Sequence, residues 1–430
     1  MKKKLLTITE YDKLTASGDG EGERGSVISS HDFEKIKKFV LSVRQTDDTV
    51  MEYLQLGYFP AYGEYLTARN YVGVLETDKY VIEILPKIAR CEKTDDNDVR
   101  EIFIRMLRTV RHLPFKTPKN ANLKSRKLHL LELFVLMFLH ELSRLVRSGI
   151  RSLYRERKEN LPMLRGRINW SEQLRNNIVH RERFFVTYDE YSPDRPENRL
   201  IKSTLLYLSK KHFSTKTAAT IMRYLFIFDS ISPSKNVLQD LRLCRHNRRM
   251  THYRKLIPWC DVFLRRESFV PHAGIHDVHA MLFPMERVFE SYVTRCLKNV
   301  CSSEWSITAQ AREKYLIEKP ERKFLMRPDV IMEKKNTEKI VLDMKWKMLD
   351  DKYTTYGISQ ADLYQMYAYA KKYDARNAIL IYPENKRFYK PMKYEFDETT
   401  VLHIVPWRFS NPLKEEAACV KDVISGIGAQ

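Results

Sequence analysis

Residues 327–345 read RPDVIMEKKNTEKIVLDMK, and this stretch decides the fold that we expect around it. Two apolar runs are separated by a polar segment, a pattern that is typical of a hairpin and predicts strands over residues 324–332 and 339–344. Asp329 lies on the first strand and Asp343 ends the second. The hairpin would therefore place the two carboxylates side by side at one end of a sheet.

These residues suit a hard metal ion. Mg²⁺ prefers oxygen ligands and retains several waters, so Asp329, Asp343 and the carbonyl of Met344 are candidate ligands. Asp343 and Lys345 share one face of the strand, where Lys345 could orient or help deprotonate a water, or stabilise charge on phosphorus oxygens. The residues thus predict metal-assisted hydrolysis of a phosphodiester; the alternative is two hairpin-end aspartates and a solvated lysine.

The flanking sequence predicts a compact α/β core around this hairpin. Its further elements are a helix over 279–299, a strand over 305–310, a helix over 359–372, and strands over 378–382 and 400–405. Gln365 and Tyr369 are four residues apart, so they share one face of the second helix. Glu286 and Glu290 are spaced in the same way on the first helix, and a surface charge pair is the alternative for them.

The order PD, D-x-K and Gln365-x-x-x-Tyr369 resembles the PD-(D/E)xK nuclease superfamily and the QxxxY element of its RecB-like members. That resemblance implies a restriction-endonuclease-like α/β core. It also implies that the catalytic residues are Asp329, Asp343, Lys345, Glu290, Gln365 and Tyr369.

Four further stretches resemble the McrC family, the nuclease subunit of McrBC modification-dependent restriction systems. They are IEILPKI (82–88), LRGRI (164–168), YDEYSPDRPENRLIK (188–202) and DLYQMYAYA (362–370). The resemblance implies a Mg²⁺-dependent DNA endonuclease subunit assembled with a hexameric McrB-like AAA+ GTPase ring. The ring would read the modified DNA and use the GTP, whose hydrolysis this chain would stimulate. The absence of a GxxxxGK loop from the chain agrees with that division of labour.

Length and charge predict a multidomain α+β protein in three parts. We expect a β-rich N-terminal domain over 1–97 that docks the AAA+ partner, a basic, mainly helical region over 98–270, and the nuclease domain over 271–430. The net charge is −3 over residues 1–100 and +20 over 101–270, out of +20 for the whole chain. This excess favours DNA as a partner of the middle region, with a solvated basic surface or an acidic protein partner as alternatives.

Local patterns place the elements of the first two parts. Strands are expected at 65–68, 71–75, 80–85, 165–170 and 183–191, helices at 99–113, 127–148, 197–212, 217–228 and 234–250, and a polar loop over 17–30. Four arginines gather at the end of the last of these helices and are candidate DNA-phosphate contacts, with a solvated helix face as the alternative. They are Arg242, Arg245, Arg248 and Arg249.

Several classes of protein are disfavoured. The longest apolar run, residues 130–139, is too short to span a bilayer, and MKKKLLTITE is not a secretory signal, so we expect a cytoplasmic chain without a membrane. Six scattered cysteines without a CxxC motif indicate reduced thiols. His272, His276 and His279 have a zinc-like spacing, but Pro271 and Gly274 argue against a regular helix there.

Two other functions remain open. One is a non-catalytic, DNA-binding activator of an AAA+ motor, which would normally have lost one member of the D…D-x-K set. The other is a stand-alone RecB-like nuclease, which would cut DNA without a nucleotide-hydrolysing partner.

Overall fold

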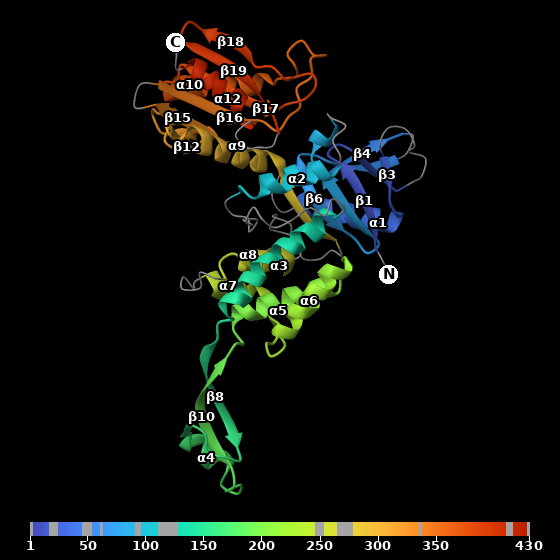
Figure 1. The fold of residues 1–430 in the computed structure, drawn as a ribbon, viewed down its shortest axis with the longest axis vertical. Coiled ribbons are helices and arrows are strands. Elements are labelled where there is room, and N and C mark those ends of the chain that lie inside the picture. Colours follow the sequence, from blue (N-terminus) through green and yellow to red (C-terminus); the bar gives the residue numbers. More distant parts are fainter. Residues whose placement is uncertain are drawn as a thin grey trace. The chain divides into compact units, whose positions relative to one another are not determined.

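The computed structural model describes residues 3–16, 25–44, 54–60, 63–90, 96–110, 128–245, 253–264, 278–334, 338–409 and 416–427. The chain forms two compact units (Figure 1). The first comprises residues 1–116, 124–130 and 268–430, and the second comprises 117–123 and 131–267. The N-terminal and C-terminal thirds of the sequence thus share one unit. The expected multidomain α/β character is confirmed at this level.

Two four-stranded sheets, with the orders β1-β7-β6-β11 and β3-β2-β5-β4, build one part of the first unit. Their strands are β1 (Lys4–Thr9), β2 (Lys13–Thr15), β3 (Gly25–Val27), β4 (Leu54–Phe59), β5 (Gly63–Ala68), β6 (Tyr71–Glu76), β7 (Tyr80–Leu85) and β11 (His279–Pro284). Apolar residues of both sheets pack in one core with helix α1 (Ser30–Arg44), which the sequence analysis missed. The strands predicted at 65–68, 71–75 and 80–85 are confirmed. Of the predicted polar loop over 17–30, residues 17–24 lie outside the described residues, while β3 and the start of α1 occupy the rest.

The helix predicted over 279–299 begins six residues later, at Met285. Residues 279–284 instead form β11, which pairs antiparallel with β6. At Gly73, with a φ of +146°, an added Cβ would lie 1.9 Å from the Met281 carbonyl oxygen, so glycine permits the close approach of these strands. Helix α9 (Met285–Cys301) then follows, and its buried side chains recur every three to four residues.

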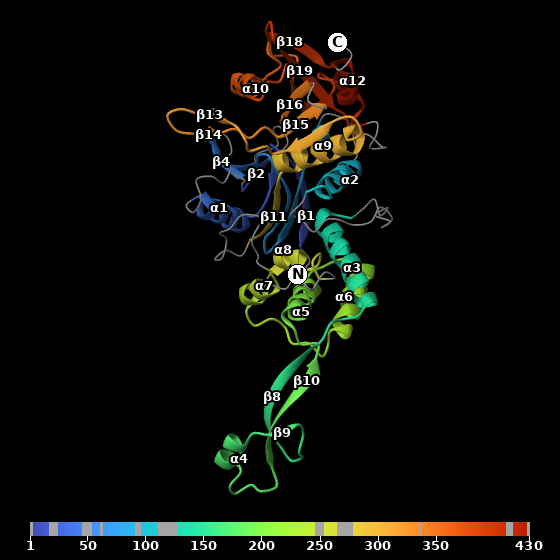
Figure 2. The same ribbon diagram turned by 90° about the vertical axis from the view of Figure 1, so that its left-hand side faces the viewer.

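A six-stranded sheet with the order β12-β15-β16-β17-β19-β18 forms the other part of this unit. Its strands are β12 (Ser306–Ala309), β15 (Val330–Lys334), β16 (Glu338–Met344), β17 (Asn377–Pro383), β18 (Met392–Asp397) and β19 (Thr400–Trp407). The central strands β16, β17 and β19 are parallel, whereas β12, β15 and β18 are antiparallel to their neighbours. Helices α10 (Gln360–Tyr373) and α12 (Ala418–Ile427) lie on opposite sides of the sheet (Figure 2).

Local chemistry sets the ends of α10. Ser359 caps its start by accepting a hydrogen bond from the Ala361 amide at 3.2 Å. Asp374 ends it in the left-handed conformation. The buried side chains Met366, Tyr369, Ala370 and Tyr373 face the sheet. The remaining elements of the first unit are η1 (Lys87–Arg90), α2 (Asp96–Leu107) and the two-stranded sheet of β13 (Tyr315–Ile317) and β14 (Lys323–Leu325).

The second unit combines helices with a long β-ribbon. Its helices are α3 (Leu130–Ser148), α4 (Trp170–Asn176), α5 (Pro196–Ser209), α6 (Thr215–Ile227), α7 (Val237–Arg245) and α8 (Ile257–Leu264). Strands β8 (Leu153–Leu161) and β10 (Phe184–Ser192) form the antiparallel ribbon, which carries β9 (Arg167–Ile168) and α4 at the end away from α5 (Figures 1 and 2).

Two expectations for this region change. The sequence analysis missed β8, so the region is less purely helical than expected. The strand predicted over 165–170 shrinks to β9, because the Asn169 side chain accepts a hydrogen bond from the Glu172 amide at 3.3 Å and starts α4. Among the described helices, none has the length and apolar character needed to cross a membrane.

Candidate active site

Two of the predicted acids meet at the end of the six-stranded sheet. In the antiparallel pairing of β15 with β16, Val330 lies opposite Leu342, so Asp329 and Asp343 occupy the next position of the register. The Met344 amide donates a hydrogen bond of 2.8 Å to Asp329 Oδ2. The structure thus brings Asp329 and Asp343 together as the hairpin pattern predicts.

Glu290 reaches the same place from α9. The side-chain amide of Gln310, which follows β12, donates to Glu290 Oε1 at 2.6 Å and to Asp329 Oδ1 at 3.2 Å. One amide nitrogen therefore links acids from two different elements. Gln310 itself has a left-handed backbone conformation, with a φ of +50°.

Burial, reinforced by nearby carboxylates, raises the pKa values of all three acids. Burial raises the pKa of Asp329 to about 8, and the negative charges of Asp343 and Glu290 reinforce the shift. Burial also raises the pKa of Asp343, against the opposing attraction of Lys345. For Glu290, burial raises the pKa more than the Gln310 hydrogen bond lowers it. The site therefore concentrates carboxylates whose negative charge is poorly solvated.

Lys345 stands beside these acids and contacts α10. Its Nζ lies 2.8 Å from Asp343 Oδ2 and 3.6 Å from Asp362 Oδ1, and it donates to Gln365 Oε1 at 3.0 Å. Burial opposes the ammonium charge, but the attraction of the neighbouring carboxylates outweighs it and raises the pKa of Lys345. The lysine is therefore held as a cation.

Gln365 and Tyr369 extend this network along one helix face. Gln365 Nε2 donates to the Tyr369 hydroxyl oxygen at 2.9 Å. Tyr369 is 6% exposed, and burial raises its pKa. The structure therefore connects Asp343, Lys345, Gln365 and Tyr369 in one chain of polar contacts, as the i, i+4 spacing suggests.

The donor chemistry of this site fits Mg²⁺. Asp329 and Asp343 provide hard carboxylate oxygens, and a cation beside them would relieve the repulsion that raises their pKa values. Within the described residues, no group of three His, Cys, Asp or Glu side chains is arranged to hold a metal ion. A ligand set of two carboxylates, the Met344 carbonyl and water is consistent with this, because Mg²⁺ usually keeps several waters.

Two polar residues of the network are not among the predicted site residues. Asp362 precedes Gln365 by three residues on α10, so their shared helix face was a usable signal. Gln310 ends the strand predicted over 305–310, but no local spacing indicates which acids its side chain contacts. Only the pairing of β12 with β15 places it beside Asp329.

The predicted basic cluster belongs to the second unit. Arg242 has an exposed side chain on α7, and α7 ends at Arg245. The side chain of Arg245 and all of Arg248 and Arg249 lie outside the described residues. For the disfavoured histidine cluster, His272 and His276 lie outside them too, and His279 begins β11.

The family model described as "McrBC 5-methylcytosine restriction system component" matches residues 66–383. The chain belongs to this McrBC family. The match spans most of the sequence and includes both the acids and the Gln365–Tyr369 pair. The resemblance to McrC that the sequence motifs indicate is thereby confirmed.

One solved structure supports the same fold for this McrBC family member, and a second was also found. A half-complex from a tetradecameric assembly of Thermococcus gammatolerans McrB AAA+ hexamers with bound McrC matches with a TM-score of 0.71 and 17% identity, covering 97% of this chain and 100% of the other. The cryo-EM structure of the Thermococcus gammatolerans McrBC complex matches with a TM-score of 0.49 and 20% identity, covering 68% and 87%. No curated protein matches the chain.

Proposed function

We propose that this McrBC family member is the DNA-cutting subunit of a restriction system, with a PD-(D/E)xK core and Mg²⁺ as its cofactor. The observation that carries the proposal is the contact of Lys345 with Asp343 on one side and Gln365 on the other. A solvated hairpin lysine would have neither partner. The buried acids beside it supply the oxygen ligands that a phosphodiester hydrolase needs.

Each residue has a distinct task in this proposal. Asp329, Asp343 and the Met344 carbonyl would hold Mg²⁺, which would supply Lewis-acid polarisation of a phosphate oxygen. Lys345 offers its ammonium to the negative charge that grows on the phosphate in the transition state. Its raised pKa favours this role over that of a base that takes a proton from water.

Gln365 and Tyr369 orient the lysine. Gln365 Oε1 accepts a hydrogen bond from Lys345 Nζ, and its amide nitrogen donates to Tyr369. Since both ends of the Gln365 amide are engaged, its carbonyl oxygen stays directed at the ammonium. Asp362 adds a second negative charge on that side of Lys345.

The proposed partner is an AAA+ GTPase ring, because the solved relative with this fold is bound to McrB hexamers. Large apolar side chains are exposed at the far end of the β8–β10 ribbon, and exposed apolar groups often mark protein contacts. They are Met163, Leu164, Trp170, Leu174, Ile178 and Val179. For the N-terminal part, which the sequence analysis expects to dock the ring, we choose Tyr58 on β4 as the surface residue to test, because its side chain is 71% exposed.

The decisive experiment compares wild-type protein with Asp343→Ala on 5-methylcytosine-containing and unmodified plasmid, with Mg²⁺, the ring partner and GTP. We expect cutting to disappear in the variant, by at least about a hundredfold, while stimulation of GTP hydrolysis stays unchanged. Loss of both activities in a folded variant would contradict this separation of roles. Cutting without the partner would instead indicate a stand-alone nuclease, and DNA binding without any cutting a non-catalytic activator.

The same assay locates the ring contact. Val179→Glu at the end of the ribbon and Tyr58→Glu on β4 both alter exposed residues that do not belong to the proposed site. The surface that docks the ring is the one whose variant loses stimulation of GTP hydrolysis. If neither variant changes stimulation, neither surface carries the contact.

A further inference from the structure

We propose that Gln310 is a positioning residue that, anchored by Glu290, holds the Asp329 carboxylate in place for metal binding. This inference rests on the proposed nuclease function and assigns a task to a residue outside its motifs. The side chain of Gln310 donates hydrogen bonds to Glu290 and Asp329, whereas Lys345 donates to Gln365 on α10.

Both the backbone and the side chain of Gln310 donate hydrogen bonds to Asp329. Its backbone amide donates to the Asp329 carbonyl at 2.8 Å, which continues the ladder between β12 and β15. Its side-chain nitrogen donates to Asp329 Oδ1 at 3.2 Å. The distance of the Gln310 side chain from Asp329 is therefore set by the backbone as well as by the side-chain bond.

The same nitrogen makes its shorter hydrogen bond to Glu290. Glu290 comes from α9, which precedes the sheet in the sequence, and its Oε1 lies 2.6 Å from Gln310 Nε2. Two carboxylates can accept hydrogen bonds but, when ionised, cannot donate one to each other. A donor with two hydrogens is what allows both oxygens to be held at one point.

The backbone of Gln310 is also unusual. Its φ of +50° lies in the left-handed region, which costs free energy for a residue with a side chain and is easily adopted by glycine. A side chain is retained here although glycine would relieve the backbone. Such strained positions concentrate at functional sites, which agrees with a task for the side chain.

The test measures metal binding directly. Mn²⁺, visible by electron paramagnetic resonance, replaces Mg²⁺ and is titrated into the full-length protein without DNA or nucleotide. We expect Gln310→Met, which keeps the length but removes the donor, to weaken Mn²⁺ binding about tenfold, as loss of a partner behind a metal ligand typically does. Gln239→Met, at an exposed position on α7, is the matched control and should bind as the wild type does.

A second variant separates positioning from support of the fold. Gln310→Gly should leave the melting temperature equal or higher, because glycine tolerates the left-handed backbone, and yet should weaken Mn²⁺ binding as Gln310→Met does. A purely structural role would lower stability and leave binding by the folded protein unchanged. That outcome would overturn the proposal.

A double-mutant cycle tests whether Gln310 acts through Glu290. In a Glu290→Gln background, Gln310→Met should have little further effect on Mn²⁺ binding, whereas full additivity would contradict the link. Asp343→Asn separates this inference from the proposed function. If wild-type protein binds no Mn²⁺, or Asp343→Asn binds it equally well, the nuclease proposal fails. If Asp343→Asn loses binding and both Gln310 variants retain it, only the role of Gln310 fails.

Discussion

At the scale of single residues, the proposed active site is a place of unfavourable charge. Glu290, Asp329 and Asp343 are brought together in a setting where burial raises each pKa. In the absence of a cation, ionising these groups costs more in the folded protein than in the unfolded chain. A site that is suited to a metal ion should therefore be a source of instability without one.

This cost predicts how stability depends on pH. The folded-state pKa of Asp329 is raised to about 8, so the folded protein holds a proton on this carboxyl more tightly than the unfolded chain does. The stabilisation that this proton provides is fully present below the unfolded pKa of 3.8 and is lost as the pH rises through about 8. In metal-free buffer, Asp329→Asn should avoid that loss. The melting temperature of the variant minus that of the wild type should then increase between pH 5 and pH 8.

Scanning calorimetry with a chelator, repeated with excess Mg²⁺, checks this expectation. Mg²⁺ should raise the melting temperature of the wild type at pH 8, because a ligand that binds the folded state stabilises it, and should affect Asp329→Asn less. The exposed Asp351→Asn is the control. A variant that melts below the wild type by the same margin at both pH values would show that charge repulsion at Asp329 is unimportant.

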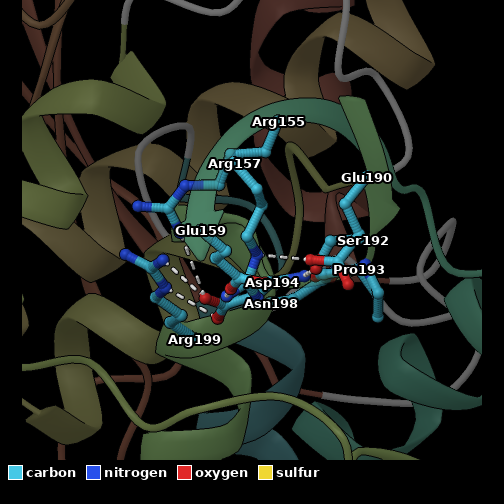
Figure 3. Close-up of polar contacts among 9 residues, drawn as sticks. All are labelled: Arg155, Arg157, Glu159, Glu190, Ser192, Pro193, Asp194, Asn198 and Arg199. Carbon is cyan, nitrogen blue, oxygen red and sulfur yellow. Dashed lines mark hydrogen bonds and ion pairs between the residues drawn. The ribbon is translucent and has the colours of Figure 1, made fainter. Parts of the chain in front are cut away.

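At the scale of elements, the base of the β8–β10 ribbon is held by a buried amide. Asn198 on α5 is fully buried; its Nδ2 donates to the carbonyls of Arg151 and Pro193, which flank the two strands, and its Oδ1 accepts from Tyr253. Figure 3 shows Asn198 beside Pro193 and Asp194 at this base. One side chain thus fixes both strands of the ribbon, at its base, to helix α5.

Ion pairs surround this amide. Asp194 forms a two-pronged contact with Arg199, of 2.8 and 2.7 Å, which holds the pKa of the carboxyl below its usual value (Figure 3). Further out along the strands, Arg157 pairs with Glu190 at 2.6 Å. The stretch over residues 188–202 that resembles the family therefore has a clear architectural task in the structure.

Replacing this amide should loosen the ribbon. Asn198→Ala leaves buried carbonyl and hydroxyl partners without their hydrogen bonds and should destabilise the second unit by about 2 to 3 kcal/mol. Hydrogen exchange should rise first at the ends of β8 and β10 next to α5. Asn176→Ala, which replaces an exposed asparagine on α4, should change neither the stability of the unit nor its hydrogen exchange. Unchanged exchange in Asn198→Ala would show that packing alone orients the ribbon.

At the scale of the whole molecule, the segment that carries Lys345, directly after β16, is tied to the N-terminal part of the chain. Trp346 follows Lys345 and is buried; its indole donates to Glu10, and its carbonyl accepts from Lys87 Nζ at 2.6 Å. The Lys87 backbone amide also donates to Glu10, at 2.8 Å. Lys87 belongs to the IEILPKI stretch, so that motif supports the segment after β16 from a distant part of the sequence.

If the proposed nuclease function holds, this contact should make DNA cutting depend on the N-terminal part of the chain. Lys87→Met removes the donor to the Trp346 carbonyl and should cost about 2 kcal/mol of stability. It should also reduce cutting in the folded protein about tenfold or more, because small displacements of catalytic groups are costly. Chemical denaturation and the plasmid assay measure the two effects. Lys386→Met, at an exposed lysine, is the control, and cutting at the wild-type rate by Lys87→Met would contradict the coupling.

The sequence by itself determined what short-range patterns encode. Alternating apolar runs placed the hairpin that carries Asp329 and Asp343, and helical spacing paired Gln365 with Tyr369, because both patterns involve neighbours along one or two adjacent elements. Most strand and helix positions near these motifs agree with the structure to within a few residues. The strand predicted over 324–332 is wrong, because it divides into β14 and β15 in different sheets, and Asp329 lies just before β15. The metal, the DNA contact of the basic region and the roles of the acids stay predictions.

Only the tertiary structure decided the contacts that join distant segments. Residues 279–284 continue the apolar pattern of α9, and they form a strand because β6 offers an edge for pairing. Lys87 and Trp346 are 259 residues apart, and Gln310 meets Glu290 through the pairing of β12 with β15. Local periodicity reports which face of an element is buried, but not which other element covers it. The partners of the candidate site acids therefore became visible only in the folded chain.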